Sequence, residues 1–238
     1  MLGGSGGSRW FWAWQSLVCG KLDKKKREDR FLGLCPGAGL FGIDGRNAGS
    51  QPKNVEQEEI CMRLERVTDS SHPMYNEALR LYRMSFPYHE QREELSQKRI
   101  LGDSEYCFDL VYDEDMFVGL ILYWENEEFI YIEHFCICPE MRNKRYGERV
   151  LALLGKGEKT LILEIDPPVD GISRRRKGFY ERCGFIDNPY EHTHPAYHPE
   201  SQGHSLVLMT CPERLSGEAF ERFSRYLGER VMKDAFAG

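Results

Sequence analysis

The sequence predicts an α/β fold with a mixed, mostly antiparallel central sheet that is flanked by helices on both faces. Two observations support this prediction. From residue 62 onward, short runs of β-branched and aromatic residues alternate with segments whose apolar residues recur at helical spacing. In addition, residues 106–112 and 116–124 read as strands joined by the tight polar turn Asp113-Glu114-Asp115, which is typical of an antiparallel hairpin.

Composition limits the class of protein. The chain has 238 residues, of which 41% are hydrophobic and 29% charged, so it can build one large or two small cores. The net charge of −6 argues against a nucleic-acid partner, which would require a basic face. No apolar run approaches the roughly 18 residues of a membrane span, so we expect no membrane partner. The eight cysteines form no CxxC pair, which indicates reduced thiols and a cytoplasmic protein.

Residues 1–61 differ from the rest of the chain. They hold 11 of the 23 glycines and three of the four tryptophans, and they show neither helical nor strand periodicity. The run Gly37–Gly42 matches GxGxxG, but no strand precedes it and no helix follows, so we reject it as a dinucleotide site. We therefore expect a disordered or non-native extension over 1–61 and a folded domain over 62–238.

The first part of the domain reads as a strand, two helices and the hairpin. Residues 62–68 alternate apolar and polar side chains, as a strand does. Pro73 is expected to open a helix, and a short charged helix is expected over 90–99. The loop between them, residues 85–90 (SFPYHE), combines aromatic, imidazole and carboxylate groups, and such loops often line substrate sites.

Residues 129–154 predict an anion site. A buried strand over 129–138 ends at Pro139, and a basic turn leads into an amphipathic helix that starts near Arg145. The unpaired amides and the positive dipole end of a helix N-terminus favour a phosphate group. The alternative is a solvated basic turn.

The remaining elements complete the fold. We expect a buried strand over 159–165, a helix over 173–183 capped by Gly184, and a short strand from residue 185. A loop rich in histidine and proline leads to a strand over 204–210. The last helix places Phe220, Phe223, Leu227 and Val231 on one face.

Two motifs stand out in residues 62–238, namely Arg142-Asn143-Lys144-Arg145-Tyr146-Gly147 and the run from Phe179 to Phe185, FYERCGF. With these motifs the segment resembles the GNAT family of N-acetyltransferases. The first motif is similar to the family's pyrophosphate loop, R/Q-x-x-G-x-G/A, and the second matches its L/F-Y-x-x-x-G-F segment. The resemblance implies a GNAT-like fold that uses acetyl-CoA as co-substrate and needs no metal.

The resemblance also implies the cofactor-binding residues. Backbone near Ile137 would hold the thioester and pantetheine, where this strand splays from the next. Ser173 takes the place of the asparagine that contacts pantetheine in the family, and Arg145 stands where the family has its first motif glycine. The pyrophosphate loop would be formed by Arg142, Asn143, Lys144, Arg145, Tyr146 and Gly147.

Acetyl transfer to an amine needs a base for the amine and an acid for the leaving thiolate. By resemblance, Tyr180 would be the general acid. For the base we expect Glu133, because desolvation in an apolar strand would raise its pKa toward a useful range. One alternative is that Glu133 is a buried carboxylate with a structural role only. Another is that Glu164, Glu125 or His134 supplies the base instead.

A second histidine group stands apart from these motifs. His192, His194, His198 and His204 suggest metal spacing, but neither interleaved cysteines nor an HExxH helix accompanies them. We expect a loop that closes over the acceptor site, with zinc as the alternative.

The sequence thus predicts an acetyl-CoA-dependent N-acetyltransferase that acts on a primary amine by direct attack. The acceptor would be a small molecule or a peptide, and the carboxylates of Glu125, Glu127 and Glu128 favour a cationic one. Whether the chain forms a homodimer stays open. The alternative of another class is a catalytically silent acyl-CoA-binding or regulatory module on the same fold.

Overall fold

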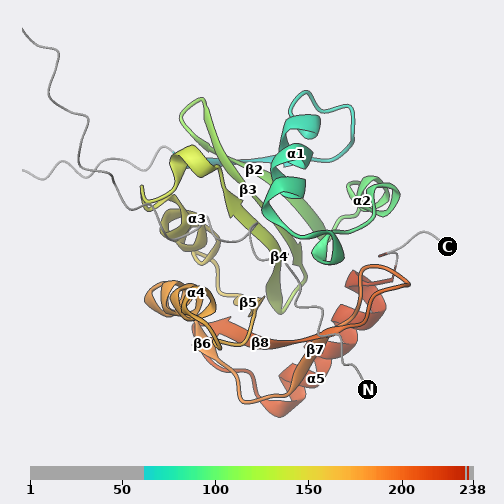
Figure 1. Cartoon of the computed structure of the whole chain (residues 1–238), viewed down its shortest axis with the longest axis vertical. Coiled ribbons are helices and arrows are strands. Elements are labelled where there is room, and N and C mark those ends of the chain that lie inside the picture. Colours follow the sequence, from blue (N-terminus) through green and yellow to red (C-terminus); the bar gives the residue numbers. More distant parts are fainter. Residues whose placement is uncertain (1–61, 234, 236–238) are drawn as a thin grey trace, which may run out of the picture. The chain divides into compact units, whose positions relative to one another are not determined.

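The computed structural model describes residues 62–233 and residue 235, and these contain one eight-stranded sheet (Figure 1). Its strand order is β1-β2-β3-β4-β5-β8-β6, and β7 pairs with β8 off this path. The strands are β1 (Met62–Val67), β2 (Tyr106–Asp113), β3 (Met116–Glu125), β4 (Phe129–Ile137), β5 (Thr160–Ile165), β6 (Ile186–Asp187), β7 (His192–His194) and β8 (His204–Cys211).

All neighbouring strands in this sheet run antiparallel except β4 and β5, which are parallel. The parallel pair follows from the helix that connects the two strands, since a parallel connection needs a crossover. The predicted mixed, mostly antiparallel sheet is confirmed.

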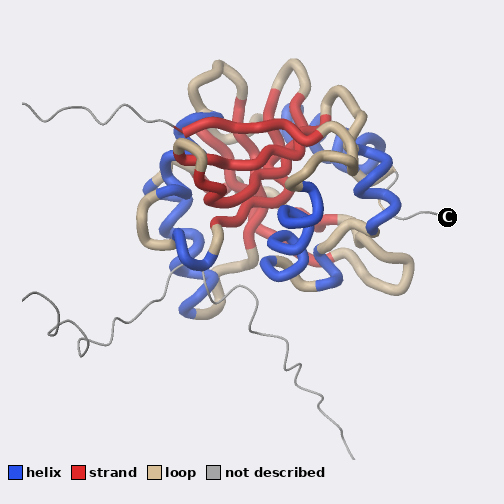
Figure 2. Tube along the Cα trace, turned by 90° about the horizontal axis from the view of Figure 1, so that it is seen from above, coloured by secondary structure: helices blue, strands red, loops and turns tan. Residues whose placement is uncertain are grey.

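Helices cover both faces of the sheet, as Figure 2 shows from above. Helices α1 and α2 and the C-terminal helix α5 pack on one core, around Phe108, Trp124 and Tyr131. Helices α3 and α4 pack on the other, around Ile121 and Phe135. The helices are α1 (Tyr75–Ser85), α2 (Glu94–Ile100), α3 (Tyr146–Leu154), α4 (Gly171–Arg182) and α5 (Gly217–Tyr226), which continues as a π-helix over Leu227–Val231.

Three local predictions need correction. Helix α1 begins at Tyr75, two residues after Pro73. The segment 90–99 contains a 3-10 turn, Tyr88–Glu90, and then α2 from Glu94. Strand β7 lies inside the loop rich in histidine and proline, where three residues are too few to show a period. The expected cap is confirmed, because Gly184 follows α4 with a φ of 91°.

Strands β4 and β5 separate after a short paired stretch. Their register joins Phe129–Ile132 to Thr160–Leu163, only four positions. Both strands continue, β4 to Ile137 and β5 to Ile165, without pairing to each other. A gap therefore opens between them. This agrees with the expectation that the strand containing Ile137 splays away from the next strand.

A bulge in β4 lies at the mouth of this gap. The register with β3 shifts there, since Tyr123 pairs with Ile132 while Leu122 pairs with His134. Glu133 is the extra residue, so strict alternation fails. Glu133 and His134 both make their contacts among the residues of the α1–α2–α5 face.

The segment 222–231 ties distant parts of this fold together. Arg230 donates to Asp103 at 2.6 Å and to Glu105 at 3.0 Å, just before β2. The Tyr226 hydroxyl also donates to Glu105, at 2.9 Å. The backbone carbonyl of Val231 accepts a hydrogen bond from Arg92 at 2.9 Å. The segment that follows β8 is thereby bound to the segments before α2 and β2.

The expectation for residues 1–61 lies outside the described residues. Within 62–233 and 235, no helix is both long and apolar enough to cross a membrane. The cysteines of this part carry free thiols, as expected: Cys107, Cys136, Cys138, Cys183 and Cys211.

Candidate functional site

The basic turn before α3 has an unusual backbone. Asn143 and Arg145 both lie in the left-handed region, with φ values of 64° and 62°. Arg145 is the N-cap of α3, as predicted from the helix pattern. Glycine adopts this conformation without steric cost, which explains why a glycine would suit position 145.

Side chains of the turn spread in different directions. Arg142 is half-buried and its Nε donates to the carbonyl oxygen of Ile137, 3.2 Å away. Burial lowers its pKa. Arg145 is exposed and pairs with Glu148, and Lys144 reaches only the Met141 sulfur, at 3.5 Å.

Tyr146 and Gly147 bind the turn to its neighbours. The Tyr146 hydroxyl donates to Asp113 at 2.7 Å, which fixes α3 to the β2–β3 turn. A Cβ placed on Gly147 would lie 3.0 Å from Cζ of Phe179, so glycine permits the close approach of α3 to α4. Tyr146 thus has a structural role, since it anchors α3 to β2, in addition to its place in the basic turn.

Next to this turn lies a cavity of about 170 Å³, which we call the turn cavity. It combines the N-terminus of α3 with guanidinium groups, and this set fits a phosphate-bearing ligand. All but two of the predicted cofactor residues line it, the exceptions being Lys144 and Ser173. Its lining residues are Ile137, Met141, Arg142, Asn143, Arg145, Tyr146, Gly147, Glu148, Phe179 and Arg182.

A second cavity, of about 70 Å³, lies where β4 and β5 separate, and we call it the central cavity. It brings together Tyr180 and Glu133, the 85–90 loop and the histidine-rich segment, which the sequence had singled out separately. Its lining residues are Phe86, Glu90, Tyr131, Ile132, Glu133, His134, Phe135, Leu163, Glu164, Ile165, Asp166, Arg176, Tyr180, His194, Tyr197, His204 and Leu206.

Tyr180 lies on α4 with its ring against Phe179 and Phe185. It is 8% exposed, and burial raises its pKa to about 12. A hydroxyl with this pKa keeps its proton at neutral pH, as a proton donor must.

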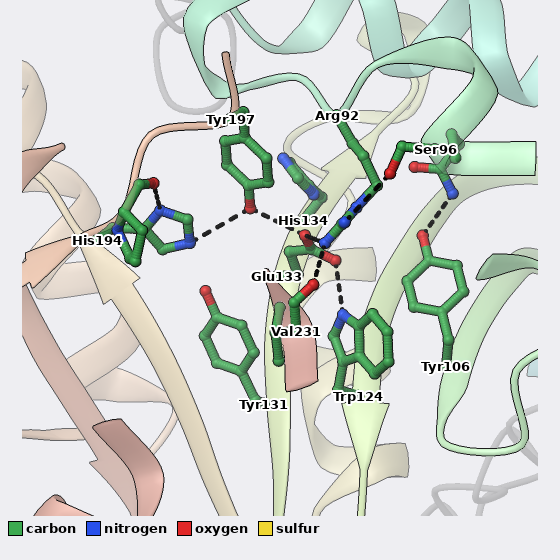
Figure 3. A network of polar contacts seen from close by, with 12 residues as sticks. Arg92, Ser96, Tyr106, Trp124, Tyr131, Glu133, His134, His194, Tyr197 and Val231 are labelled. Atoms are coloured by element: carbon green, nitrogen blue, oxygen red, sulfur yellow. Dashed lines mark hydrogen bonds and ion pairs between the residues drawn. The ribbon is translucent and has the colours of Figure 1, made fainter. Parts of the chain in front are cut away.

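Glu133 lies at the centre of a buried polar network (Figure 3). Arg92 and Tyr197 each donate to Oε1 at 2.9 Å, and the Trp124 indole donates to Oε2 at 2.9 Å. Burial by itself would raise the pKa of Glu133, but the charge of Arg92, the neighbouring His134 and the hydrogen bonds from Arg92 and Trp124 together lower the pKa to about 2. The expected rise is wrong, and a base of this pKa holds protons weakly at neutral pH.

The sequence prediction missed the partners of Glu133. Arg92 sits in a charged segment that reads as solvated, yet its side chain is 1% exposed. Tyr197 lies among prolines and histidines without any period. The only available signal was the general rule that a buried carboxylate needs a cationic partner, and this rule does not say which cation it is.

The histidine-rich segment meets the carboxylate of Glu164. His192 hydrogen-bonds to Oε1, His194 Nε2 lies 3.9 Å from Oε2, and the Tyr131 hydroxyl donates to Oε2 at 2.6 Å. Burial by itself would raise the pKa of Glu164, but His194, His192 and the hydrogen bond from Tyr131 together lower it. His198 instead stacks on Tyr88, with ring centres 4.1 Å apart.

Other predicted residues lie elsewhere. Ser173 forms a capping box with Asp170 at the start of α4, and it lines neither cavity. Glu125 pairs with Lys159 at 2.9 Å. Together with Glu127 and Glu128 it lines a separate hollow beside Leu154, so these three carboxylates do not face the central cavity. His134 does, and its Nε2 contacts the carbonyl oxygen of Glu90 at 2.8 Å.

Comparisons with known proteins bear on the family of the chain. Residues 71–185 match the model of the acetyltransferase (GNAT) family. A solved structure from Bacteroides thetaiotaomicron, described as a GNAT-family acetyltransferase, is 29% identical with a TM-score of 0.67, and the match covers 71% of this chain and 98% of that one. A Bacillus subtilis acetyltransferase solved in complex with CoA is 13% identical, with a TM-score of 0.42 and coverage of 63% and 97%.

One curated relative is also similar in sequence. YjbC of Bacillus subtilis, which is named as an acetyltransferase, is 22% identical over 102 residues. The match covers 42% of this chain and about half, 52%, of that relative. The family match, the shared fold and the two motifs agree, and the chain belongs to the GNAT family of acetyltransferases.

Proposed function

We propose that this chain is an acetyl-CoA-dependent N-acetyltransferase that moves an acetyl group directly to a primary amine. The observation that carries the proposal is the placement of two consecutive residues of α4. Phe179 lines the turn cavity and Tyr180 lines the central cavity. One helix thus joins an anion site to a buried cavity that contains a proton donor.

The turn cavity fits the CoA part of the donor. Arg142, Arg145 and Arg182 supply positive charge, and α3 supplies its N-terminal amides for a pyrophosphate. The gap beyond Ile132 leaves β4 without pairing to β5, so backbone groups on that side, apart from the Ile137 carbonyl that accepts from Arg142, would hold the pantetheine arm. When bound, acetyl-CoA would supply the thioester that the amine attacks.

The central cavity fits the acceptor amine. Carboxylates of Glu90, Glu164 and Asp166 line it, and they favour a cationic amine by charge complementarity. Tyr180 would return a proton to the departing sulfur. The prediction of a cationic acceptor therefore rests on these carboxylates and no longer on Glu125, Glu127 and Glu128.

The test measures binding and turnover separately. Calorimetry with acetyl-CoA should show saturable binding, and a thiol-release assay against a panel of primary amines should show turnover. Binding without release of CoA for any amine would instead favour the silent acyl-CoA-binding module. Absence of acetyl-CoA binding would overturn both assignments.

A further inference from the structure

We propose that His194 is the general base that accepts the proton of the acceptor amine, and that Glu164 stabilises the resulting imidazolium. This assignment rests on the proposed acetyl transfer. It replaces Glu133, whose carboxylate is bound by Arg92, Trp124 and Tyr197.

The hydrogen bonds of His194 fix its tautomer. Its Nδ1 lies 2.6 Å from the carbonyl oxygen of Pro195, and a carbonyl can only accept. Nδ1 therefore carries the hydrogen and the lone pair is on Nε2. A catalytic base needs such a lone pair, together with a partner that holds its other nitrogen.

The lone pair on Nε2 remains available. The Tyr197 hydroxyl lies 3.4 Å from Nε2, but this hydroxyl donates its single hydrogen to Glu133 at 2.9 Å (Figure 3). A hydrogen bond to a carboxylate is the stronger of the two. His194 lines the central cavity, where we place the acceptor amine.

Glu164 is the positioning residue for the charged form of His194. Its Oε2 lies 3.9 Å from Nε2, within the range in which a carboxylate stabilises an imidazolium. The other titratable groups that face His194 are Tyr197 on the same loop, His204 on β8 and His134 on β4. None of these three groups is a carboxylate, so among the named neighbours Glu164 supplies the negative charge.

Backbone geometry holds the imidazole in place. His194 pairs with His204 in the β7–β8 register. A Cβ at Gly203 would lie 2.6 Å from the carbonyl oxygen of His194, so the turn can close this tightly only with glycine. The ring also stacks on Tyr197, with centres 4.9 Å apart. The base is thus preorganised by local contacts.

The proton balance is complete. An amine that arrives protonated first releases one proton to bulk water. As the C–N bond forms and the thioester C–S bond breaks, the neutral amine nitrogen then loses one further proton to Nε2 of His194. The sulfur gains one proton from the Tyr180 hydroxyl. Transfer of the proton from the imidazolium to the Tyr180 phenolate, through water, restores both side chains.

The experiment compares pH profiles of His194→Gln and of wild-type protein with the same amine. We expect kcat at neutral pH to fall by about 10²- to 10⁴-fold in the variant, with acetyl-CoA affinity unchanged. In the plot of kcat against pH, the rise that reflects deprotonation of the base should be present for the wild type and absent for the variant. Added imidazole should partly restore turnover in His194→Ala. His72→Gln, a histidine that pairs with Glu65 away from both cavities, is the matched control.

Glu164→Gln gives an independent test, because it keeps His194 and does not depend on whether a His194 variant folds. Loss of the carboxylate charge should shift the same rise to lower pH by about one unit. An active wild type with unchanged profiles in these variants would overturn the role of His194 and leave the proposed function standing. A wild type that binds acetyl-CoA but acetylates no amine would overturn the proposed function, and this role with it.

Discussion

The guanidinium of Arg92 lies 2.9 Å from Oε1 of Glu133, and each side chain is 1% exposed. The two residues are 41 positions apart, and their contact joins the segment before α2 to the bulge of β4. A buried ion pair is strongly destabilising to break, because the remaining charge stays buried without its partner.

Removing one side of this pair should therefore cost much stability. We expect Glu133→Ala to lower the free energy of unfolding by about 3–5 kcal/mol, measured by urea denaturation. Glu125→Ala is the matched control, since Glu125 pairs with Lys159 at the same 2.9 Å in a partly exposed setting. That change should cost at most about 1 kcal/mol. Equal losses in the two variants would contradict a special role for the buried pair.

The lowered pKa of Glu133 makes stability depend on pH. The pKa is about 2 in the folded chain against an ordinary 4.5, so the stabilisation is present above pH 4.5 and is lost as the pH falls toward 2. We expect the wild type to lose about 2 kcal/mol more than Glu133→Gln between pH 6 and pH 3. Urea unfolding at several pH values measures this difference. Parallel curves for the two proteins would exclude Glu133 as the titrating group.

Replacing the hydroxyl of Tyr180 should affect turnover and not folding. We expect Tyr180→Phe to reduce kcat by about 10²-fold or more, because the thiolate loses its proton donor. The acetyl-CoA affinity should stay unchanged. Tyr190→Phe is the control, since the Tyr190 hydroxyl donates to the carbonyl of Leu215 and the residue lines neither cavity. Unchanged turnover in Tyr180→Phe would remove this residue from the role of acid.

The left-handed backbone at Arg145 predicts a gain in stability. Arg145→Gly should raise the free energy of unfolding by about 1 kcal/mol, because glycine reaches a φ of 62° without steric cost. Arg145→Ala keeps the strain and removes the same exposed charge, so it separates the two effects. A gain of equal size in Arg145→Ala would show that the charge, and not the backbone, is responsible.

Sequence reasoning recovered the parts of this protein whose signals are local. The turn before α3 and the segment around Tyr180 were found because strand, turn and helix patterns lie within a few residues of each other. The direction of the Glu133 pKa could not be found in this way, since it depends on Arg92, a residue remote in sequence. The capping box that Ser173 forms was not predicted, although Asp170 three residues earlier is the usual sign of a helix cap, and the contact of Ser173 with pantetheine stays a prediction.

The bulge in β4 explains a further limit. A period of two places Glu133 and His134 on opposite faces of the sheet, whereas the extra residue puts their contacts on one face. Nothing in the composition of 129–138 marks where alternation breaks. The face of the sheet to which Glu133 points in the central cavity therefore follows only from the β3–β4 register in the structure.

The hydrogen bonds made by segment 222–231 bear on how the two halves of the sheet are held together. Four register positions hold β4 to β5, and beyond them the strands form two arms that pairing no longer holds together. Arg230 and Tyr226 act as a strut between the segment that follows β8 and the segment before β2. Arg230, a residue that lines neither cavity, thus links the segment that follows β8 to the β2 side of the sheet by side-chain contacts, where β4 and β5 share only four register positions.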